Sequence, residues 1–401
     1  MSDASAANLD SPAPREPSAR ITHWVLPICN FLSKGWEVSI LGLLVVLQQQ
    51  SALPLYMLGL LSTVFIVSQI SISLFAGAIA HALGNRNVIL MSIAASGTAW
   101  LILLLPATYY TLFPAYMFAG IASGLFEPIG NSLIAMGASA KNRGTAIGNF
   151  AACGDMGRIA MSAVAISLAG YFGMAATCGV LLATTLAAFA LSLLVSQSRS
   201  TAAGVEPVVE ARVRFDTLLT NQKFCYATIA GIADSFSSAS LYIFIPVLLI
   251  AKGISLANTG WFTALLFAGY LMGRLWLGRL SDRHGKPAIL IASEIAMTVL
   301  ILLLIMVVSN GVMLFSLIFL LGICTRGSSP IIRAMVADSM DEKNSFHNAF
   351  SAYSFASRGS TALSRPIYGY LASYAGISAV FYVAATVSLL TLYPAAKYRS
   401  S

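Results

Sequence analysis

The sequence predicts an all-α membrane protein whose 12 transmembrane helices form two pseudo-symmetric six-helix bundles. Of its 401 residues, 58 % are apolar and only 9 % are charged, whereas a soluble domain carries roughly 25 % charged residues. Apolar runs of about 20 residues, long enough to cross a bilayer, recur along the chain. The second half of the chain also repeats the first half, which predicts two bundles of the same construction.

The internal repeat is visible in single residues. Four residues of the first half meet the same residue type 201 positions later: Ile28, Gly59, Gly77 and Gly84. Further along, Tyr171 meets Tyr374 at a distance of 203 positions. A period of half the chain indicates a duplicated domain, and membrane transporters are commonly built from two such repeats.

The predicted spans follow the apolar runs in chain order. They cover residues 22–47, 53–77, 87–106, 112–137, 144–169, 173–197, 223–250, 257–278, 287–308, 312–337, 346–373 and 376–396. The Ser/Ala/Pro-rich start has no apolar core, so it is expected to be a disordered cytoplasmic tail and not a signal peptide. The predicted domains are this tail (1–20), a first bundle (21–197), a polar cytoplasmic linker (198–222) and a second bundle (223–398).

Positive charges predict the orientation, because Lys and Arg near helix ends stay on the cytoplasmic side. With both termini in the cytoplasm, 15 of the 23 Lys and Arg residues lie on that side, and only Lys252 lies in an outer loop. This predicts a multi-pass protein of the cytoplasmic (inner) membrane. It also accounts for the net charge of +8, so the basic composition predicts a lipid bilayer and no nucleic acid as partner.

No enzyme chemistry is indicated. The five cysteines have neither metal-site nor disulfide spacing, and no nucleophile–base pair or Walker phosphate loop is present. We expect no catalytic residue, no metal and no cofactor, and a monomer. Without nucleotide hydrolysis, an ion gradient is the economical energy source.

One motif carries a family resemblance. The segment after the eighth predicted helix reads Gly-Arg-Leu-Ser-Asp-Arg-His-Gly-Lys over residues 278–286. It resembles the Gly-x-x-x-Asp-Arg-x-Gly-Arg/Lys loop of the major facilitator superfamily, at the same place between helices two and three of a six-helix half. Residues 77–86 are a weaker copy in which His81 replaces the acid. The resemblance implies the major facilitator fold and a gating role for Gly278, Asp282, Arg283 and Gly285.

Charges deep in the membrane are the sharpest functional signal, because each one is costly and needs a partner, a wet cavity or a function. The deep charges are Glu37, Glu127, Asp234 and Arg326, in predicted helices 1, 4, 7 and 10. In the family these four helices line the central cavity. Polar residues repeat at helical spacing beside each charge, which predicts the wall of a wet cavity.

The residue types suggest roles. No histidine lies deep in a helix, so a proton carrier has to be a carboxylate, and we expect Glu37, then Glu127, then Asp234. An arginine grips carboxylate or phosphate in a forked geometry. The predicted substrate-binding residues are Arg326, Arg358, Asn30, Asn131, Ser238 and Tyr242.

A further pair and a further acid complete the prediction. Asp155 and Arg158 lie three residues apart in helix 5, close enough to pair, and they are expected to be structural or gating residues. Glu294 belongs to a helix that is peripheral in this fold, so a structural or edge position is expected. The alternative for all deep charges is that they only tie helices together.

The leading hypothesis is a proton-coupled secondary active transporter of a small anionic or zwitterionic solute, working by alternating access. Export in exchange for protons is expected first, although the helix-five signature of many antiporters is missing at residues 154–158. The alternatives are uptake of an organic anion by symport with protons and, in another class, a membrane sensor that does not transport.

Overall fold

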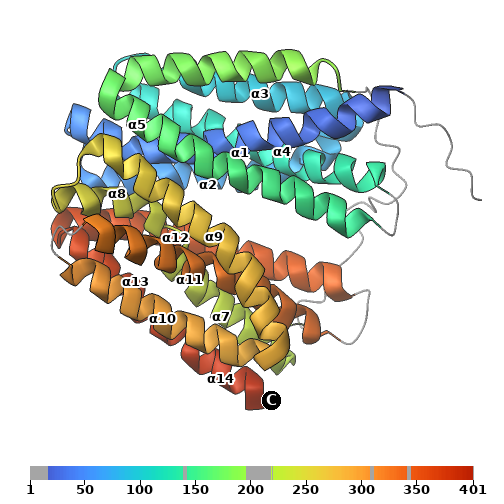
Figure 1. Ribbon diagram of the computed structural model, residues 1–401. Coiled ribbons are helices and arrows are strands. Elements are labelled where there is room, and N and C mark those ends of the chain that lie inside the picture. The colour runs from blue at the N-terminus through green and yellow to red at the C-terminus, as the bar shows by residue number, and fades with distance from the viewer. Residues whose placement is uncertain are drawn as a thin grey trace, which may run out of the picture.

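The chain is helical throughout the part that the computed structural model describes, namely residues 17–138, 142–195, 218, 220–307, 311–340 and 345–400. The first half contains α1 (Pro17–Ser51), α2 (Leu55–Leu83), α3 (Asn85–Leu103), α4 (Tyr109–Gly137) and α5 (Arg143–Ser192). The second half contains α7 (Gln222–Ser238), α8 (Leu241–Ala251), α9 (Leu256–His284), α10 (Lys286–Met306), α11 (Gly311–Asp338), α12 (Ser345–Tyr374), α13 (Ile377–Leu390) and α14 (Leu392–Ser400). Figure 1 shows the helices of each half gathered in one layer, with α5 and α9 meeting between them.

The described helices are consistent with 12 spans. Nine of them are long and apolar enough to cross a membrane. The helix α5 bends at Gly173, where the backbone leaves the helical region, and Figure 1 shows its two arms folded back on each other. Dividing α5 at this bend and adding the more polar α9 and α12 gives the predicted number. α9 and α12 are more polar in part because α9 carries three arginines, including Arg274, and α12 carries two, including Arg365.

Three boundaries differ from the sequence-based expectation. The expected tail and linker lie outside the described residues, except that α1 already begins at Pro17 and α7 at Gln222. The expected loop from residue 278 onward is wrong, because α9 continues to His284 and only Gly285, with φ of 90°, turns the chain. The seventh span is interrupted at Ala239 and Ser240, between α7 and α8. Such a break is tolerated at membrane depth where it is buried in protein.

The repeat reappears in the backbone. The residues that turn the chain after corresponding helices are glycines with positive φ: Gly84 and Gly285 in one pair, Gly173 and Gly376 in the other. A side chain would be strained in this conformation, so glycine is required at each turn. The two halves therefore share their turns as well as their helix order.

The halves touch closely at one end of the molecule, which we call the closed end. There α2 crosses α12, and a Cβ on Gly59 would come within 2.3 Å of the Arg365 carbonyl oxygen. On the other side α5 crosses α9, and a Cβ on Gly260 would lie 2.8 Å from the Ala163 carbonyl oxygen. Gly59 and Gly260 are repeat partners, so the same glycine in each half permits the same close helix crossing.

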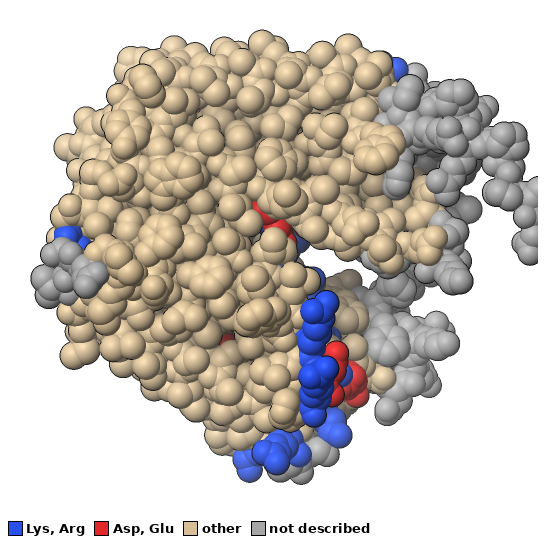
Figure 2. All heavy atoms as spheres, in the orientation of Figure 1, with Lys and Arg blue, Asp and Glu red and all other residues tan. Residues whose placement is uncertain are grey.

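The opposite end, which we call the open end, holds the start of α1 and the end of α9. Figure 2 shows a hollow between the two halves on this side, with acidic surface at its inner end and Lys and Arg side chains along its lower edge. Lys252 lies at the closed end, where its Nζ donates to the carbonyl oxygens of Ile305 and Val307 at 2.8 and 2.6 Å. The hollow leads from the open end toward the charged residues of the membrane-spanning helices.

Candidate functional site: a charged network between the two halves

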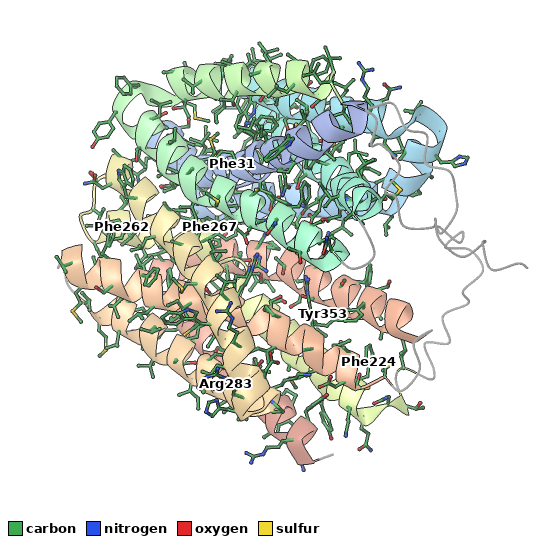
Figure 3. All side chains as sticks on the ribbon, turned by 45° about the vertical axis from the view of Figure 1, so that its right-hand side comes forward. Phe31, Phe224, Phe262, Phe267, Arg283 and Tyr353 are labelled. Atoms are coloured by element: carbon green, nitrogen blue, oxygen red, sulfur yellow. The ribbon has the colours of Figure 1, made fainter. Side chains whose placement is uncertain are left out.

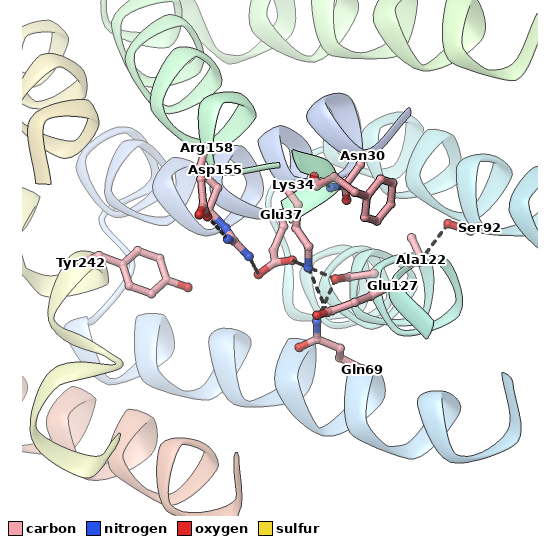
Figure 4. A network of polar contacts seen from close by, with 12 residues as sticks. Asn30, Lys34, Glu37, Gln69, Ser92, Ala122, Glu127, Asp155, Arg158 and Tyr242 are labelled. Carbon is pink, nitrogen blue, oxygen red and sulfur yellow. Dashed lines mark hydrogen bonds and ion pairs between the residues drawn. The ribbon is translucent and has the colours of Figure 1, made fainter. Parts of the chain in front are cut away.

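The site begins on α1, where Lys34 and Glu37 lie one turn apart and face the interior. Lys34 Nζ lies 2.9 Å from Glu37 Oε2 and also 2.9 Å from Glu127 Oε2 on α4. Ser123, one turn before Glu127, donates to Glu37 Oε2 at 2.9 Å, and Gln69 on α2 donates to Ser123 at 2.7 Å. The stripes predicted on helices 1 and 4 therefore meet, with one ammonium group between two carboxylates (Figure 4).

The network continues into α5 and across to the second half. Arg158 lies 3.7 Å from Glu37 Oε1 and 2.7 Å from Asp155 Oδ1. The other oxygen of Asp155 pairs with Arg274 of α9. Asp155 and Arg158 thus form the predicted pair, and Asp155 also carries an ion pair between the two halves. Three cations and three carboxylates alternate along this chain of contacts, so its formal charges cancel.

A small cavity adjoins Glu37 inside the first half. It is lined by residues of α1, α3 and α4, among them Trp36, Ser96, Trp100 and Ser123. The indole nitrogen of Trp100 is buried and has no hydrogen-bond partner within the described part of the chain. A buried N–H without a partner beside a polar cavity is a typical place for a bound water molecule. The cavity therefore offers Glu37 a polar surrounding on the side away from Arg158.

Three arginines of the second half, unlike Arg274, lack such neutralisation. Among the described residues, Arg326 on α11 and Arg358 and Arg365 on α12 have no carboxylate oxygen within 4.0 Å. Arg326 is half-buried and lies within electrostatic reach of Asp234, while Arg358 is exposed and lies within reach of Glu127. The wall contributed by the second half is therefore cationic, and it faces a network that is already neutral.

Arg365 is the most deeply buried of these arginines, with 4 % of its surface exposed. Its guanidinium donates to the Ser62 carbonyl oxygen of α2 and, at 3.5 Å, to the Tyr242 hydroxyl, while its Nε finds no acceptor among the described residues. Tyr242 follows the break between α7 and α8 and points toward Arg158 and Glu37 (Figure 4). The cation and the phenol thus lie where the two halves meet.

Asp234, the third of the predicted proton carriers, lies against a second acid. The carboxyl group of Glu294 on α10 lies within reach of it, and Ser328 donates to Asp234 Oδ1 at 2.7 Å. Glu294 is only 1 % exposed, so the expectation of an edge position is wrong. Helical periodicity alone could not show that this face of α10 turns toward α7.

The other predicted binding residues are less well placed for a ligand. Asn30 is buried and donates to the Phe150 carbonyl oxygen at 2.6 Å, which ties α1 to α5. Asn131 is half-buried on α4. Ser238 is buried at the end of α7, beside the break that precedes Tyr242. The contact of Asn30 lies within the first half and therefore supports a packing role.

The motif residues lie at the open end. Gly278 is inside α9, and Gly285 ends that helix. Asp282 and Arg283 are exposed, and the described part of the chain contains no ion pair to either of them; Figure 3 shows Arg283 at the far end of α9, away from Phe262 and Phe267. The ion pair found at this end joins Lys286 to Asp338. A latch through Asp282 would require the two halves to approach each other here.

Four charged residues of these clusters were not among the predicted site residues: Lys34, Arg274, Glu294 and Arg365. Lys34 and Arg365 were visible in the polar stripes of their helices, so that signal was present. Arg274 is set in the apolar sequence Leu-Met-Gly-Arg-Leu-Trp-Leu, and a single charge in such a run is itself a functional signal in a membrane helix.

Comparison with known proteins agrees with this geometry. The family model of the Major Facilitator Superfamily matches residues 28–233 and 227–399, one match for each half. A curated relative, the uncharacterized MFS-type transporter YE1530 of Yersinia enterocolitica, is 24 % identical over 276 residues, which are 66 % of this chain and 68 % of that protein.

Solved structures show the same fold at low sequence identity. The crystal structure of a variant of the nucleoside transporter NupG has a TM-score of 0.79 at 12 % identity, covering 94 % of this chain and 99 % of that chain. A bacterial homolog of the human lysosomal transporter Spinster, in its inward-facing and occupied conformation, has a TM-score of 0.73 at 14 % identity, covering 96 % of each chain. At these identities the likeness shows the fold alone, so the substrate has to be argued from the site.

Proposed function

The chain belongs to the major facilitator superfamily, and we propose that it is a proton-coupled secondary active transporter of a small organic solute that carries an anionic or zwitterionic group. It works by alternating access, with the hollow at the open end facing the cytoplasm. The open end holds the start of α1 and the Lys and Arg side chains along the edge of the hollow, and an excess of positive charge favours the cytoplasmic side.

A single observation supports the choice of an anionic group: the acids of the first-half network have cationic partners, whereas Arg326, Arg358 and Arg365 of the second half have no carboxylate partner among the described residues. Lys34, Arg158 and Arg274 neutralise the first-half carboxylates. Arg326, Arg358 and Arg365 are therefore not needed to balance them. A buried or half-buried guanidinium without a carboxylate is costly, and a carboxylate or phosphate of the solute would supply the missing partner in a forked geometry.

The rest of the binding surface is aromatic and polar. Tyr242 lies within electrostatic reach of Arg326 and Arg365 on one side and of Glu37 and Arg158 on the other. It can therefore contact a solute held between the two halves, with its ring as an apolar surface and its hydroxyl as donor or acceptor. Arg365 adds a second cation to Arg326 in this part of the site.

Proton coupling is assigned to Glu37 and Glu127. The two carboxylates share one ammonium group, so a proton on either acid releases Lys34 to the other acid. Glu127 also lies within reach of Arg358, where an anionic solute would repel its carboxylate. Solute and proton then favour each other's binding, and this favours symport, the alternative that the sequence left open, over exchange.

Ligand binding to the purified protein tests the anion site. A ligand that binds only the folded state raises the melting temperature by mass action, so a panel of anionic, zwitterionic, cationic and neutral metabolites is compared. Anions should stabilise the wild-type protein, and Arg326→Ala should weaken the best anion roughly 10- to 100-fold, the worth of a charge-assisted hydrogen bond of about 1.5–3 kcal/mol. Arg399→Ala, which removes the same charge at an exposed position, is the matched control.

The outcomes separate the competing functions. Stabilisation by cations or neutral drugs only, unaffected by Arg326→Ala, would rule out the anion site. Flux of the stabilising anion into sealed vesicles then distinguishes a carrier from a sensor that binds without transport. A pH gradient that is acidic outside drives uptake for symport and efflux for exchange.

A further inference from the structure

A second group of buried acids lies apart from the Lys34 network, at the junction of α7, α10, α11 and α13. Asp234 is 4 % exposed and Glu294 is 1 % exposed. Their carboxyl groups lie close enough to interact directly, although they lie 60 positions apart in the sequence. Neither has a Lys or Arg nitrogen within 4.0 Å among the described residues.

Serine hydroxyls complete part of the surroundings. Ser328 of α11 donates to Asp234 Oδ1 at 2.7 Å, and Ser388 of α13 donates to Glu294 Oε2 at 2.7 Å. Thr298, one turn after Glu294, donates to Ser388 at 3.2 Å and so orients it. The remaining oxygen of Glu294, Oε1, is buried and has no N–H or O–H donor in the described part of the chain.

One bound proton would account both for the contact between the two acids and for the buried Glu294 oxygen that has no donor. An ionised carboxylate can only accept hydrogen bonds, so two carboxylates bond to each other only when one of them carries a proton. Two neighbouring acids that are both ionised in a buried site would repel each other strongly. For this reason carboxyl pairs in other proteins share a single proton. A shared proton also provides the donor that Glu294 otherwise lacks.

We propose that Asp234 and Glu294 form a proton-binding site in the second half, which holds one proton between the two carboxyl groups. The titratable groups that face it are few. Arg326 and Tyr353 lie within electrostatic reach of Asp234, from α11 and α12, and Cys324 of α11 lies within reach of Glu294. Arg326 is the only cation among these neighbours.

Because Arg326 lies near the pair, the presence or absence of the proton changes the charge that this arginine meets. When the pair holds its proton, it presents one negative charge, and when the proton leaves it presents two. Loss of the proton therefore strengthens the attraction between Asp234 and Arg326, in competition with an anionic solute. This consequence rests on the proposed function, whereas occupancy of the pair by a proton does not.

Infrared difference spectroscopy tests the occupancy directly, because a protonated carboxyl has a carbonyl stretch that an ionised one lacks. The purified full-length protein at neutral pH should show this band, and both Glu294→Gln and Asp234→Asn should remove it. Ser388→Ala is the matched control: it deletes a hydrogen bond to Glu294 but leaves both acids, so the band should persist at a shifted frequency. A band that is absent from the wild-type protein, or unchanged in both acid variants, overturns the proposal.

Thermal unfolding gives an independent measurement. The folded pair keeps a proton that the unfolded chain has released at neutral pH, so the unfolding equilibrium constant should rise up to tenfold for each pH unit. Glu294→Gln supplies a fixed N–H donor in place of the proton, so it should fold and should lose this part of the pH dependence.

If Na⁺ stabilises the wild-type protein but not Glu294→Gln, a metal cation occupies the pair and the proton assignment is wrong. Neither result depends on a transported solute, so the pair can fail while the proposed function stands, or the reverse.

Discussion

The two halves of this transporter share helix order, turns and glycine crossings, yet they handle buried charge in opposite ways. In the first half, Lys34 and Arg158 contact carboxylates on their own half, and Arg274 reaches across to Asp155. In the second half, Arg365 is buried without a carboxylate, and two acids lie against each other instead. Duplication preserved the backbone, while the charges diverged. The difference suggests a division of labour in which one half carries balanced charge and the other offers unbalanced charge to solute and proton.

Lys34→Met should cause the largest loss of stability among the variants considered, because it removes the central cation of the first half. It removes the one ammonium group from between Glu37 and Glu127 and leaves two carboxylates without their shared partner. Breaking a buried pair in this way costs about 3–5 kcal/mol, to be measured by unfolding of the purified protein in detergent. Adding Glu127→Gln should restore part of the loss, because it removes the acid that depends on Lys34, while Glu37 keeps its contact with Arg158. A melting temperature that Lys34→Met leaves unchanged would contradict the network.

Gly59→Ala tests the symmetric contact by which the halves are held. The new Cβ would lie 2.3 Å from the carbonyl oxygen of Arg365, part of the backbone of α12, so the two helices must separate. Overpacking of this kind costs about 1–3 kcal/mol. Gly77→Ala is the matched control, since no atom lies within 4 Å of its Cβ and alanine favours a helix. Equal melting temperatures for the two variants would argue against the close crossing at the closed end.

The pair between the halves can be isolated by a double-mutant cycle with Asp155→Asn and Arg274→Gln. Because Asp155 also contacts Arg158, only the interaction term of the cycle reports on Arg274. We expect a coupling of about 0.5–3 kcal/mol, measured from the four unfolding curves. The same variants should separate α5 from α9 more easily, seen as greater labelling of cysteines placed along this crossing. A coupling of zero would mean that Arg274, like Arg326 and Arg365, has no stabilising carboxylate partner.

Arg365→Met should have the smallest effect on stability, so it shows most clearly how a buried cation of the second half differs from Lys34 of the first half. A buried guanidinium without a carboxylate gains little from its surroundings, and an apolar side chain of similar length keeps the packing of its stem. We expect the melting temperature to stay the same or to rise, opposite in sign to Lys34→Met. Binding of the stabilising anion should weaken at the same time. A large loss of stability would show that Arg365 is a structural tie to α2.

Much of the fold was predictable because the bilayer imposes simple rules on sequence. Apolar runs of sufficient length predicted the spans, and the repeated glycines predicted two related halves. The misplaced loop after residue 278 shows the limit of this reasoning. Polar residues such as Ser281 and Asp282 end an apolar run but not a helix, which continues until Gly285 adopts a positive φ.

The sequence predicted many of the residues of the candidate site, but few of the contacts between them. Glu37, Glu127 and Asp155 were found because a charge stands out in an apolar helix. Glu294 was placed at the periphery, because the position of a helix in a bundle does not say which of its faces turns inward. That face became visible only when α10 was packed against α11 and α13.

The sequence by itself determined that the chain is a membrane protein of two related halves with charges at the depth of a cavity, because insertion into lipid constrains each helix separately. Only the tertiary structure decided which charge meets which. Lys34 lies 93 positions from Glu127 and Asp155 lies 119 positions from Arg274. Contacts over such distances depend on how the helices rotate and cross, and the glycines at the crossings set that arrangement. The balance of the first half and the imbalance of the second are therefore properties of packing, although every residue that produces them stands in the sequence.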